Sequence, residues 1–343
     1  MGRDATIDIV RSMAILLMVA ANMAIIAAGD PAWAFRLFAS FAAPIFIILA
    51  NMMVVLGIRR GKDVSSSIIK CLFLFIVAGL FDLSNSLLPF INVDVLYMLG
   101  ISLIITSIFA KYSNKVMIGA IVIILAITPY LQWKFGYQQQ MIFDITDENV
   151  KFYFLNYFNE ALHRHFIDGW FPLFPWVSLA LFGGVIGKLR YAAASHTSFC
   201  SKQYVLISLA LITIGAILWY FYPGEQAVRY DYIELFYQPV PGFMIFMMGV
   251  TLGVICCIDY IGDISLAKVI HPLGEAPLFM YLFHIAFIDH VLLPLGTITF
   301  GVRYIIYYLL LISLMLILSR VLEKIRKQSF YKKSPHVVKW VFG

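Results

Sequence analysis

Apolar positions run in long stretches of helical length, and short polar connections separate them. A bilayer crossing needs about 20 mostly apolar residues, and a continuous run of this kind is typical of a membrane-spanning helix. The pattern predicts an all-α, polytopic integral membrane protein with about ten transmembrane helices. The ten windows cover residues 7–28, 34–57, 66–90, 94–110, 116–133, 170–190, 202–222, 239–258, 276–295 and 302–320.

Composition excludes several other classes of protein. The chain is 62% hydrophobic and 13% charged, whereas a soluble domain is about 45–50% apolar and about 25% charged. No Gly-x4-Gly-Lys-Ser/Thr sequence occurs, which excludes a self-contained ATP-driven pump. The four cysteines are expected to be free thiols on the cytoplasmic side.

Basic residues orient the predicted helices. They cluster in the connections after even-numbered windows, whereas the long connection 134–169 follows an odd-numbered window and is rich in Asp and Glu. By the positive-inside rule both termini face the cytoplasm, 134–169 is extracytoplasmic and 321–343 is a basic cytoplasmic tail. We expect residues 1–343 to form a single transmembrane domain. The net charge of +6 favours anionic membrane lipid as a partner and, without a basic domain outside the bilayer, gives no support for nucleic acid.

Polar residues within the first predicted helix are candidates for function. Asp8 and Arg11 are three residues apart and therefore share a helix face. They form either a local salt bridge or, through the guanidinium of Arg11, a contact for a phosphate-bearing substrate. Asn22 follows three turns later and serves either to join helices or to do chemistry.

Carboxylates mark the next connections. Asp30 precedes Pro31 in a short outer turn, where Arg36 could pair with it. In the third window Asp82 and Asn85 share a face, and Asp82 is either a site residue or a structural hydrogen-bonding group.

Histidines give two further candidates. His163, His165 and Asp168 resemble a metal-ligand spacing, but no cysteine or second histidine pair accompanies them, so we predict no metal site. His284 lies in the middle of the ninth window, where a histidine is rare, and both a structural and a functional role stay open.

Three stretches together resemble one family. They are 7–12 (IDIVRS) running into Met18 and Asn22, 168–176 (DGWFPLFPW) with Gly183, Gly184 and Gly187, and 272–274 (PLG) followed by Tyr281 and His284. In this order they resemble the heparan-alpha-glucosaminide N-acetyltransferase-like family of transmembrane acyltransferases. The chain resembles a divergent bacterial-type member, because the usual loop histidine is missing and Asp30 stands near its place. Ser12 and Asn51 also stand where glycine is common.

The resemblance implies that acyl-CoA enters from the cytoplasm and acylates an acceptor on the other side. Asn22 matches the family's first-helix asparagine. We expect Asp30 to act as general base, with Asn22 and His284 as polarising donors. No permanently bound cofactor is expected, and acetyl-CoA or another acyl-CoA is the co-substrate. Arg11, Arg59 and Arg60 are expected to hold the CoA phosphates. The expected acceptor-binding residues are Arg36, Asp82, Asp168 and Trp170.

The acceptor that we expect is a cell-envelope sugar or glycolipid, reached from a bacterial inner (plasma) membrane. The absence of Asn-x-Ser/Thr sequons favours a prokaryotic source. A homodimer is compatible with the sequence. Two alternatives stay open: a carrier or flippase that uses the same polar path without chemistry, and a non-catalytic scaffold, suggested by the missing histidine.

Overall fold

A computed structural model describes residues 4–84, 89–91, 93–137, 156–193, 196–224, 234–262 and 265–343. Within these residues, nine helices are long and apolar enough to cross a membrane, and the shorter apolar helix Val95–Phe109 falls in the remaining predicted window. The prediction of an all-α polytopic membrane protein is confirmed. The predicted windows are also close to the observed helices; for example, 116–133 becomes Asn114–Phe135.

The chain packs as two compact units. Unit 1 comprises Ile47–Tyr230 and Phe236–Gly253, and unit 2 comprises Gly2–Phe46, Asp231–Leu235 and Val254–Gly343. Each unit therefore combines segments that are far apart in the sequence. The prediction of one transmembrane domain over 1–343 stays a prediction.

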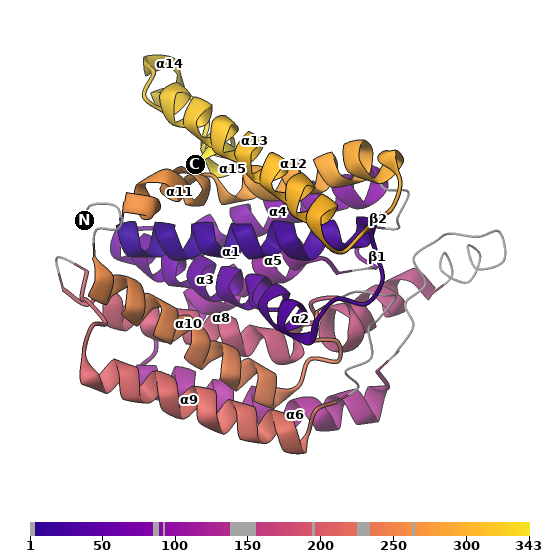
Figure 1. Ribbon diagram of the computed structural model, residues 1–343. Helices are drawn as coiled ribbons and strands as arrows, with labels where there is room; N and C mark the ends of the chain where they lie inside the picture. Colours follow the sequence, from indigo (N-terminus) through magenta and orange to yellow (C-terminus); the bar gives the residue numbers. More distant parts are fainter. Residues whose placement is uncertain are drawn as a thin grey trace. The chain divides into compact units, whose positions relative to one another are not determined.

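Unit 1 is a set of packed helices (Figure 1). Among them α4 packs against α5, α5 against α8, and α6 against α8. Its helices are α4 (Val64–Ser84), α5 (Val95–Phe109), α6 (Asn114–Phe135), α8 (Leu173–Arg190) and α9 (Lys202–Phe221), with most of α3 (Ala42–Arg59) and of α10 (Pro241–Ile261).

Glycines let the helices of unit 1 approach closely. A Cβ on Gly183 of α8 would lie 2.3 Å from the carbonyl oxygen of Ile48 on α3, so no other residue fits there. On α9, a Cβ on Gly215 would lie 2.2 Å from the backbone nitrogen of Phe246 on α10. Helices in lipid gain little from the hydrophobic effect when they associate, and close backbone packing replaces it.

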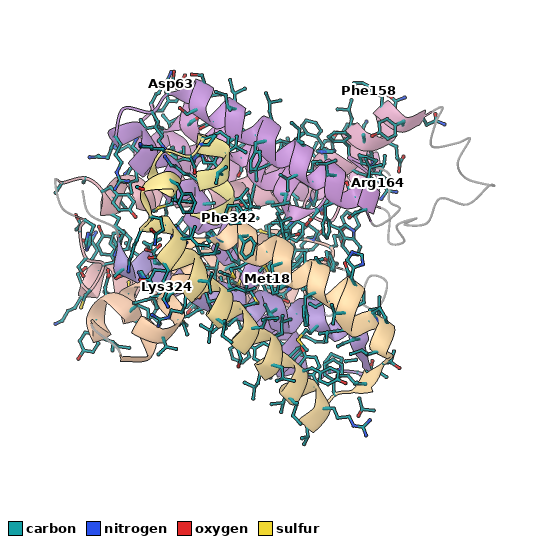
Figure 2. The ribbon with its side chains drawn as sticks, turned by 90° about the horizontal axis from the view of Figure 1, so that it is seen from above. Met18, Asp63, Phe158, Arg164, Lys324 and Phe342 are labelled. Carbon is teal, nitrogen blue, oxygen red and sulfur yellow. The ribbon has the colours of Figure 1, made fainter. Side chains whose placement is uncertain are left out.

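Three basic connections gather at one end of unit 1. Lys188 at the end of α8 donates to the carbonyl oxygen of Tyr112. Arg59 at the end of α3 donates to the carbonyl oxygen of Ala192 at 3.0 Å. Figure 2 shows Asp63 at one end of this unit and Arg164 at the other. This grouping is what the predicted topology requires, while the orientation across a bilayer stays a prediction.

Unit 2 is built around α1 (Ala5–Met23), which packs against α11, α12 and α13 (Figure 1). The core of this unit contains Ile15, Val19, Met23, Leu273, Met280 and Met315. A short parallel pairing of β1 with β2 joins its two loops, with Ala27 opposite Ile298. The further elements are the 3₁₀ helix η1 (Ala24–Ile26), β1 (Ala27–Ala28), α2 (Trp33–Ala39), α11 (Ser265–Glu275), α12 (Pro277–Phe287), the π-helix η4 (Ile288–Leu292), the 3₁₀ helix η5 (Leu293–Leu295), β2 (Ile298–Thr299), α13 (Val302–Arg326), α14 (Ser329–Lys332) and α15 (His336–Phe342).

The structure differs from the sequence pattern around residue 276. The segment 259–275 reads as a connection, yet α11 occupies Ser265–Glu275 within it. The helix then breaks at Ala276, whose φ of −126° and ψ of 59° are not helical. A residue that precedes proline is disfavoured in the helical region, and Pro277 follows. The stretch 272–274 therefore lies on α11, and His284 lies on α12.

The predicted outer loop and basic tail are both partly helical. Within 134–169, α6 extends to Phe135, residues 156–163 form a helix and the π-helix η2 covers Arg164–Asp168. The remainder of that loop, 138–155, and Asn85 lie outside the described residues. In the tail, the ring of Phe342 on α15 packs against Phe279 of α12 with ring centroids 5.3 Å apart.

Candidate functional site

The far end of α1 carries Asn22, and α12 brings His284 to it. The two residues are 262 positions apart in the sequence, and Asn22 Nδ2 lies 2.9 Å from His284 Nε2. His284 is completely buried, and its Nδ1 lies 2.9 Å from the carbonyl oxygen of Met280 one turn earlier. Asn22 itself is half-buried. The structure therefore joins two of the three predicted catalytic residues in one hydrogen-bonded pair.

Tyrosines of α13 fix the position of α1. Tyr304 donates its hydroxyl to the carbonyl oxygen of Ala20. One turn further along α13, Tyr308 donates to the carbonyl oxygen of Leu16 at 3.2 Å. Both acceptors precede Asn22 on the same helix, so these bonds restrain the segment that presents its side chain.

Asp30 lies in the exposed turn after β1. Gly29 supplies the left-handed backbone of this turn with φ of 98°. The β1–β2 pairing ties the turn to the loop before α13. Within the described part of the chain, Asp30 makes no hydrogen bond or ion pair, and the pairing with Arg36 considered for it is not formed. Its role as a base stays a prediction.

Arg36 is half-buried on α2. Its carbonyl oxygen accepts the hydroxyl of Ser40 at 2.7 Å. Ser40 Oγ in turn accepts the backbone N–H of Leu235 at 2.6 Å, which fastens a distant segment of unit 2 to the end of α2. The role of Arg36 in binding an acceptor stays a prediction.

The near end of α1 carries the Asp8–Arg11 pair. Arg11 Nη1 donates to Asp8 Oδ1 at 2.8 Å and to the carbonyl oxygen of Gly274 at 2.9 Å. A Cβ on Gly274 would lie 2.2 Å from the carbonyl oxygen of Asp8, so α11 touches α1 here. Ser12 completes the contact by accepting the Gly274 N–H at 2.9 Å. The local salt bridge considered for Arg11 is thus formed, and its contact with a phosphate stays a prediction.

Further charged groups surround this end of α1, and sequence reasoning missed them. His271 of α11 lies 3.5 Å from Asp8 and 3.5 Å from Glu275. Arg326 of α13 pairs with Glu275 and donates to the carbonyl oxygen of Phe342 at 2.8 Å. His271 and Glu275 fall in the segment 259–275, which the sequence pattern gives as a connection, and Arg326 falls in the predicted basic tail.

Asp82 lies in unit 1 and is 3% exposed. It accepts the hydroxyl of Tyr97 at 2.5 Å, and the same hydroxyl accepts the N–H of Phe90 at 3.1 Å. This arrangement satisfies a buried carboxyl group without a cation among the described residues. The hydrogen-bonding role considered for Asp82 is therefore present, and a role in acceptor binding stays a prediction.

Asp168 and Trp170 also lie in unit 1, and both are buried. Asp168 Oδ1 lies 3.0 Å from Nδ1 of His163, whose Nε2 lies 3.0 Å from the carbonyl oxygen of Phe135. The hydrogen bond to Asp168 raises the pKa of His163 above its usual value. Trp170 packs edge-on against Tyr237 with ring centroids 4.7 Å apart. Both predicted acceptor-binding residues thus have partners within the protein.

Arg59 and Arg60 lie at the basic end of unit 1, where α3 ends and its following turn begins. Both side chains are exposed. Their predicted contact with CoA phosphates stays a prediction.

These features define a class of protein. Long apolar helices carry a few hydrogen-bonded polar groups. Unit 2 holds the Asp8–Arg11 pair at one end of α1, and near the other end Asn22 of α1 meets His284 of α12. The protein is thus an integral membrane protein whose membrane-spanning helices carry hydrogen-bonded polar side chains.

Comparison with known sequences gives the family. The family described as "Heparan-alpha-glucosaminide N-acetyltransferase, catalytic" matches residues 3–226. The chain belongs to this family of membrane acetyltransferases, as the sequence resemblance predicted. The match includes Asn22 and Asp30, whereas His284 lies beyond it. No curated protein matches the sequence.

Proposed function

We propose that the protein transfers an acetyl group from cytoplasmic acetyl-CoA to an extracytoplasmic sugar or glycolipid. Family membership supports acetyl transfer, and the observation that carries the location is the Asn22–His284 pair inside unit 2. Polar groups within membrane-spanning helices are costly and mark functional paths. We place the reaction at Asn22.

The length of α1 suits an acyl donor, acetyl-CoA, that reaches partway across the membrane. Arg11 and Asn22 are eleven residues apart on one straight helix, which is about 17 Å at 1.5 Å per residue. In this proposal the phosphates of acetyl-CoA bind near Arg11 at the cytoplasmic end. The pantetheine arm then extends along α1 and brings the thioester to Asn22.

The chemical step is a direct acyl transfer. The amine or hydroxyl of the acceptor attacks the thioester carbonyl carbon, so a C–N or C–O bond forms and the C–S bond breaks. Coenzyme A leaves as the thiolate and receives the proton that the acceptor loses, which Asp30 carries as the general base. The remaining N–H of Asn22 stabilises the negative charge that develops on the carbonyl oxygen.

The setting in the cell is also a proposal. We infer a bacterial inner membrane, a cell-envelope acceptor and, as one arrangement, a homodimer. The basic tail 321–343 contacts anionic lipid in this setting, because clustered Lys and Arg next to a span favour such a contact.

A direct assay tests the proposal. Detergent-purified protein is incubated with acetyl-CoA and glucosamine, and both the free thiol of CoA and acetylated glucosamine are measured. Asn22→Ala is expected to lower the formation of both products by roughly 10²–10³-fold. Ser313→Ala, which removes an exposed hydroxyl on α13, is the matched control and is expected to leave them unchanged.

The alternatives predict different results. Absence of thiol release and of product contradicts the proposal. Counterflow of a sugar in liposomes without CoA would then identify a carrier. If neither acetyl transfer nor counterflow is detected, the non-catalytic scaffold is the remaining alternative.

A further inference from the structure

The two ring nitrogens of His284 face partners of different kinds. Nδ1 faces the carbonyl oxygen of Met280 at 2.9 Å. Nε2 faces the carboxamide nitrogen of Asn22 at 2.9 Å. The side chain is 0% exposed. Water therefore does not compete for either nitrogen, and the protein partners decide where the proton lies.

The partner of Nδ1 fixes the tautomer. A carbonyl oxygen only accepts hydrogen bonds, so Nδ1 must carry a hydrogen. A charged imidazolium would be costly in a fully buried position where no carboxylate of the described residues is hydrogen-bonded to the ring. The ring is therefore neutral, with its hydrogen on Nδ1 and a lone pair on Nε2.

The lone pair on Nε2 in turn fixes Asn22. An asparagine side chain has an oxygen end and a nitrogen end of nearly the same shape, and only the nitrogen end donates. Nε2 therefore selects the NH₂ group, as the structure shows. The Oδ1 of Asn22 has no hydrogen-bond partner within the described residues, and the side chain is half-buried rather than enclosed.

We propose that His284 is a positioning residue that holds the Asn22 carboxamide with Oδ1 and one N–H directed at the reactants. This inference rests on the proposed acetyl transfer and deepens it. Oδ1 accepts the N–H or O–H of the attacking acceptor and orients its lone pair, while the remaining N–H contacts the carbonyl oxygen of the thioester. His284 itself has no hydrogen left to donate, so the sequence-based role of a polarising donor passes to Asn22 alone.

A functional consequence separates positioning from proton transfer. A glutamine at position 284 offers a carboxamide oxygen close to the place of Nε2, so it can still accept from Asn22, but it cannot take up a proton in the working range of pH. Alanine offers no acceptor. Glutamine therefore rescues a positioning role, whereas it does not rescue a general base.

The first test reads the tautomer without any activity. Protein labelled with ¹⁵N-histidine is studied by nuclear magnetic resonance, and the His284 signals are assigned by their loss in His284→Gln. The expected spectrum between pH 6 and 8 shows a protonated Nδ1 and an unprotonated Nε2. Asn22→Leu is expected to shift the Nε2 signal. A protonated Nε2, alone or as imidazolium, would overturn the inference.

The second test uses thiol release from acetyl-CoA with glucosamine. We expect His284→Ala to lower kcat at least tenfold with little change in KM for acetyl-CoA, because a free amide can turn its wrong end to the reactants. We expect His284→Gln to stay within about threefold of the wild-type kcat, with an unchanged pH profile. If both variants are equally inactive although both fold and bind acetyl-CoA, His284 acts in proton transfer and the inference is wrong.

The two tests separate the inference from the function beneath it. An inactive wild-type protein contradicts acetyl transfer and, with it, the catalytic part of the inference. The tautomer spectrum then still shows whether His284 orients Asn22. A wild-type enzyme that is active but holds the other tautomer refutes the positioning role while the proposed function stands.

Discussion

Two histidines, one in each unit, show how the partners of an imidazole decide its charge. His163 in unit 1 has two acceptors, the carboxylate of Asp168 and the carbonyl oxygen of Phe135, so both of its nitrogens need hydrogens and the cation is favoured. Nδ1 of His284 in unit 2 faces a carbonyl acceptor, whereas its Nε2 faces the amide donor of Asn22, so the neutral ring is favoured. The first arrangement is an ion pair that fastens two segments, and the second orients an amide. The residue type alone therefore does not determine whether a histidine is charged or neutral.

Breaking the neutral pair is expected to have the largest effect. Asn22→Ala removes the carboxamide, and loss of one donor to a developing oxyanion lowers turnover by roughly 10²–10³-fold. Thiol release and product formation measure this loss, and the matched control is Ser313→Ala. Wild-type turnover in Asn22→Ala would show that the pair is structural only.

Breaking the charged pair is expected to lower the stability of the protein. Asp168→Asn replaces the carboxylate that His163 contacts at 3.0 Å. A hydrogen bond to a charged group contributes about 2 kcal/mol, so the midpoint of thermal unfolding in detergent should fall by several degrees. An unchanged midpoint would contradict the ion pair.

The pH dependence of stability sharpens the comparison. The pKa of His163 is raised above its usual 6.5, chiefly by the hydrogen bond to Asp168. Its contribution to stability is therefore fully present below pH 6.5 and is lost as pH rises through the raised pKa. We expect the unfolding midpoint to fall as the pH rises above 6.5, the pKa of an ordinary histidine.

Two variants isolate the part of that fall due to His163. His163→Gln is expected to flatten the pH dependence. His196→Gln changes an exposed histidine in the connection after α8 and is expected to retain it. Equal slopes in both variants would assign the pH dependence to other groups.

The smallest effect is expected at Arg11. Its guanidinium already contacts Asp8 and the carbonyl oxygen of Gly274, so a donor phosphate would add to these contacts. Arg11→Ala is expected to raise the Kd for acetyl-CoA about two- to fivefold, in the range of a single partly solvated ion pair. The control is Arg303→Ala, an exposed arginine at the start of α13. Unchanged affinity would remove Arg11 from the donor site.

The sequence predicted the helices well because hydropathy alone determines them. The window 302–320 became Val302–Arg326, and 202–222 became Lys202–Phe221. Helix α11 escaped notice because its eleven residues contain His271, Pro272 and Glu275 and form no long apolar run. Its role appears only in packing, where Gly274 touches α1.

The candidate site was predicted as separate residues rather than as contacts. Asn22 and His284 stand out because polar groups are rare in apolar windows, but nothing in the pattern aligns helices that are 262 residues apart. The tautomer of His284 depends on the carbonyl oxygen of Met280, which is a backbone group that every residue has. For the same reason, the sequence could not show that Tyr97 satisfies Asp82.

Titration calorimetry of acetyl-CoA into the detergent-purified wild-type protein tests the central claim most directly, because it needs no knowledge of the acceptor. An acetyltransferase that uses this donor must bind it, so the account predicts saturable binding with a micromolar Kd, about −8 kcal/mol. Binding should persist in Asn22→Ala, which removes chemistry rather than the phosphate contacts. Absence of binding for both acetyl-CoA and a longer acyl-CoA would contradict the account.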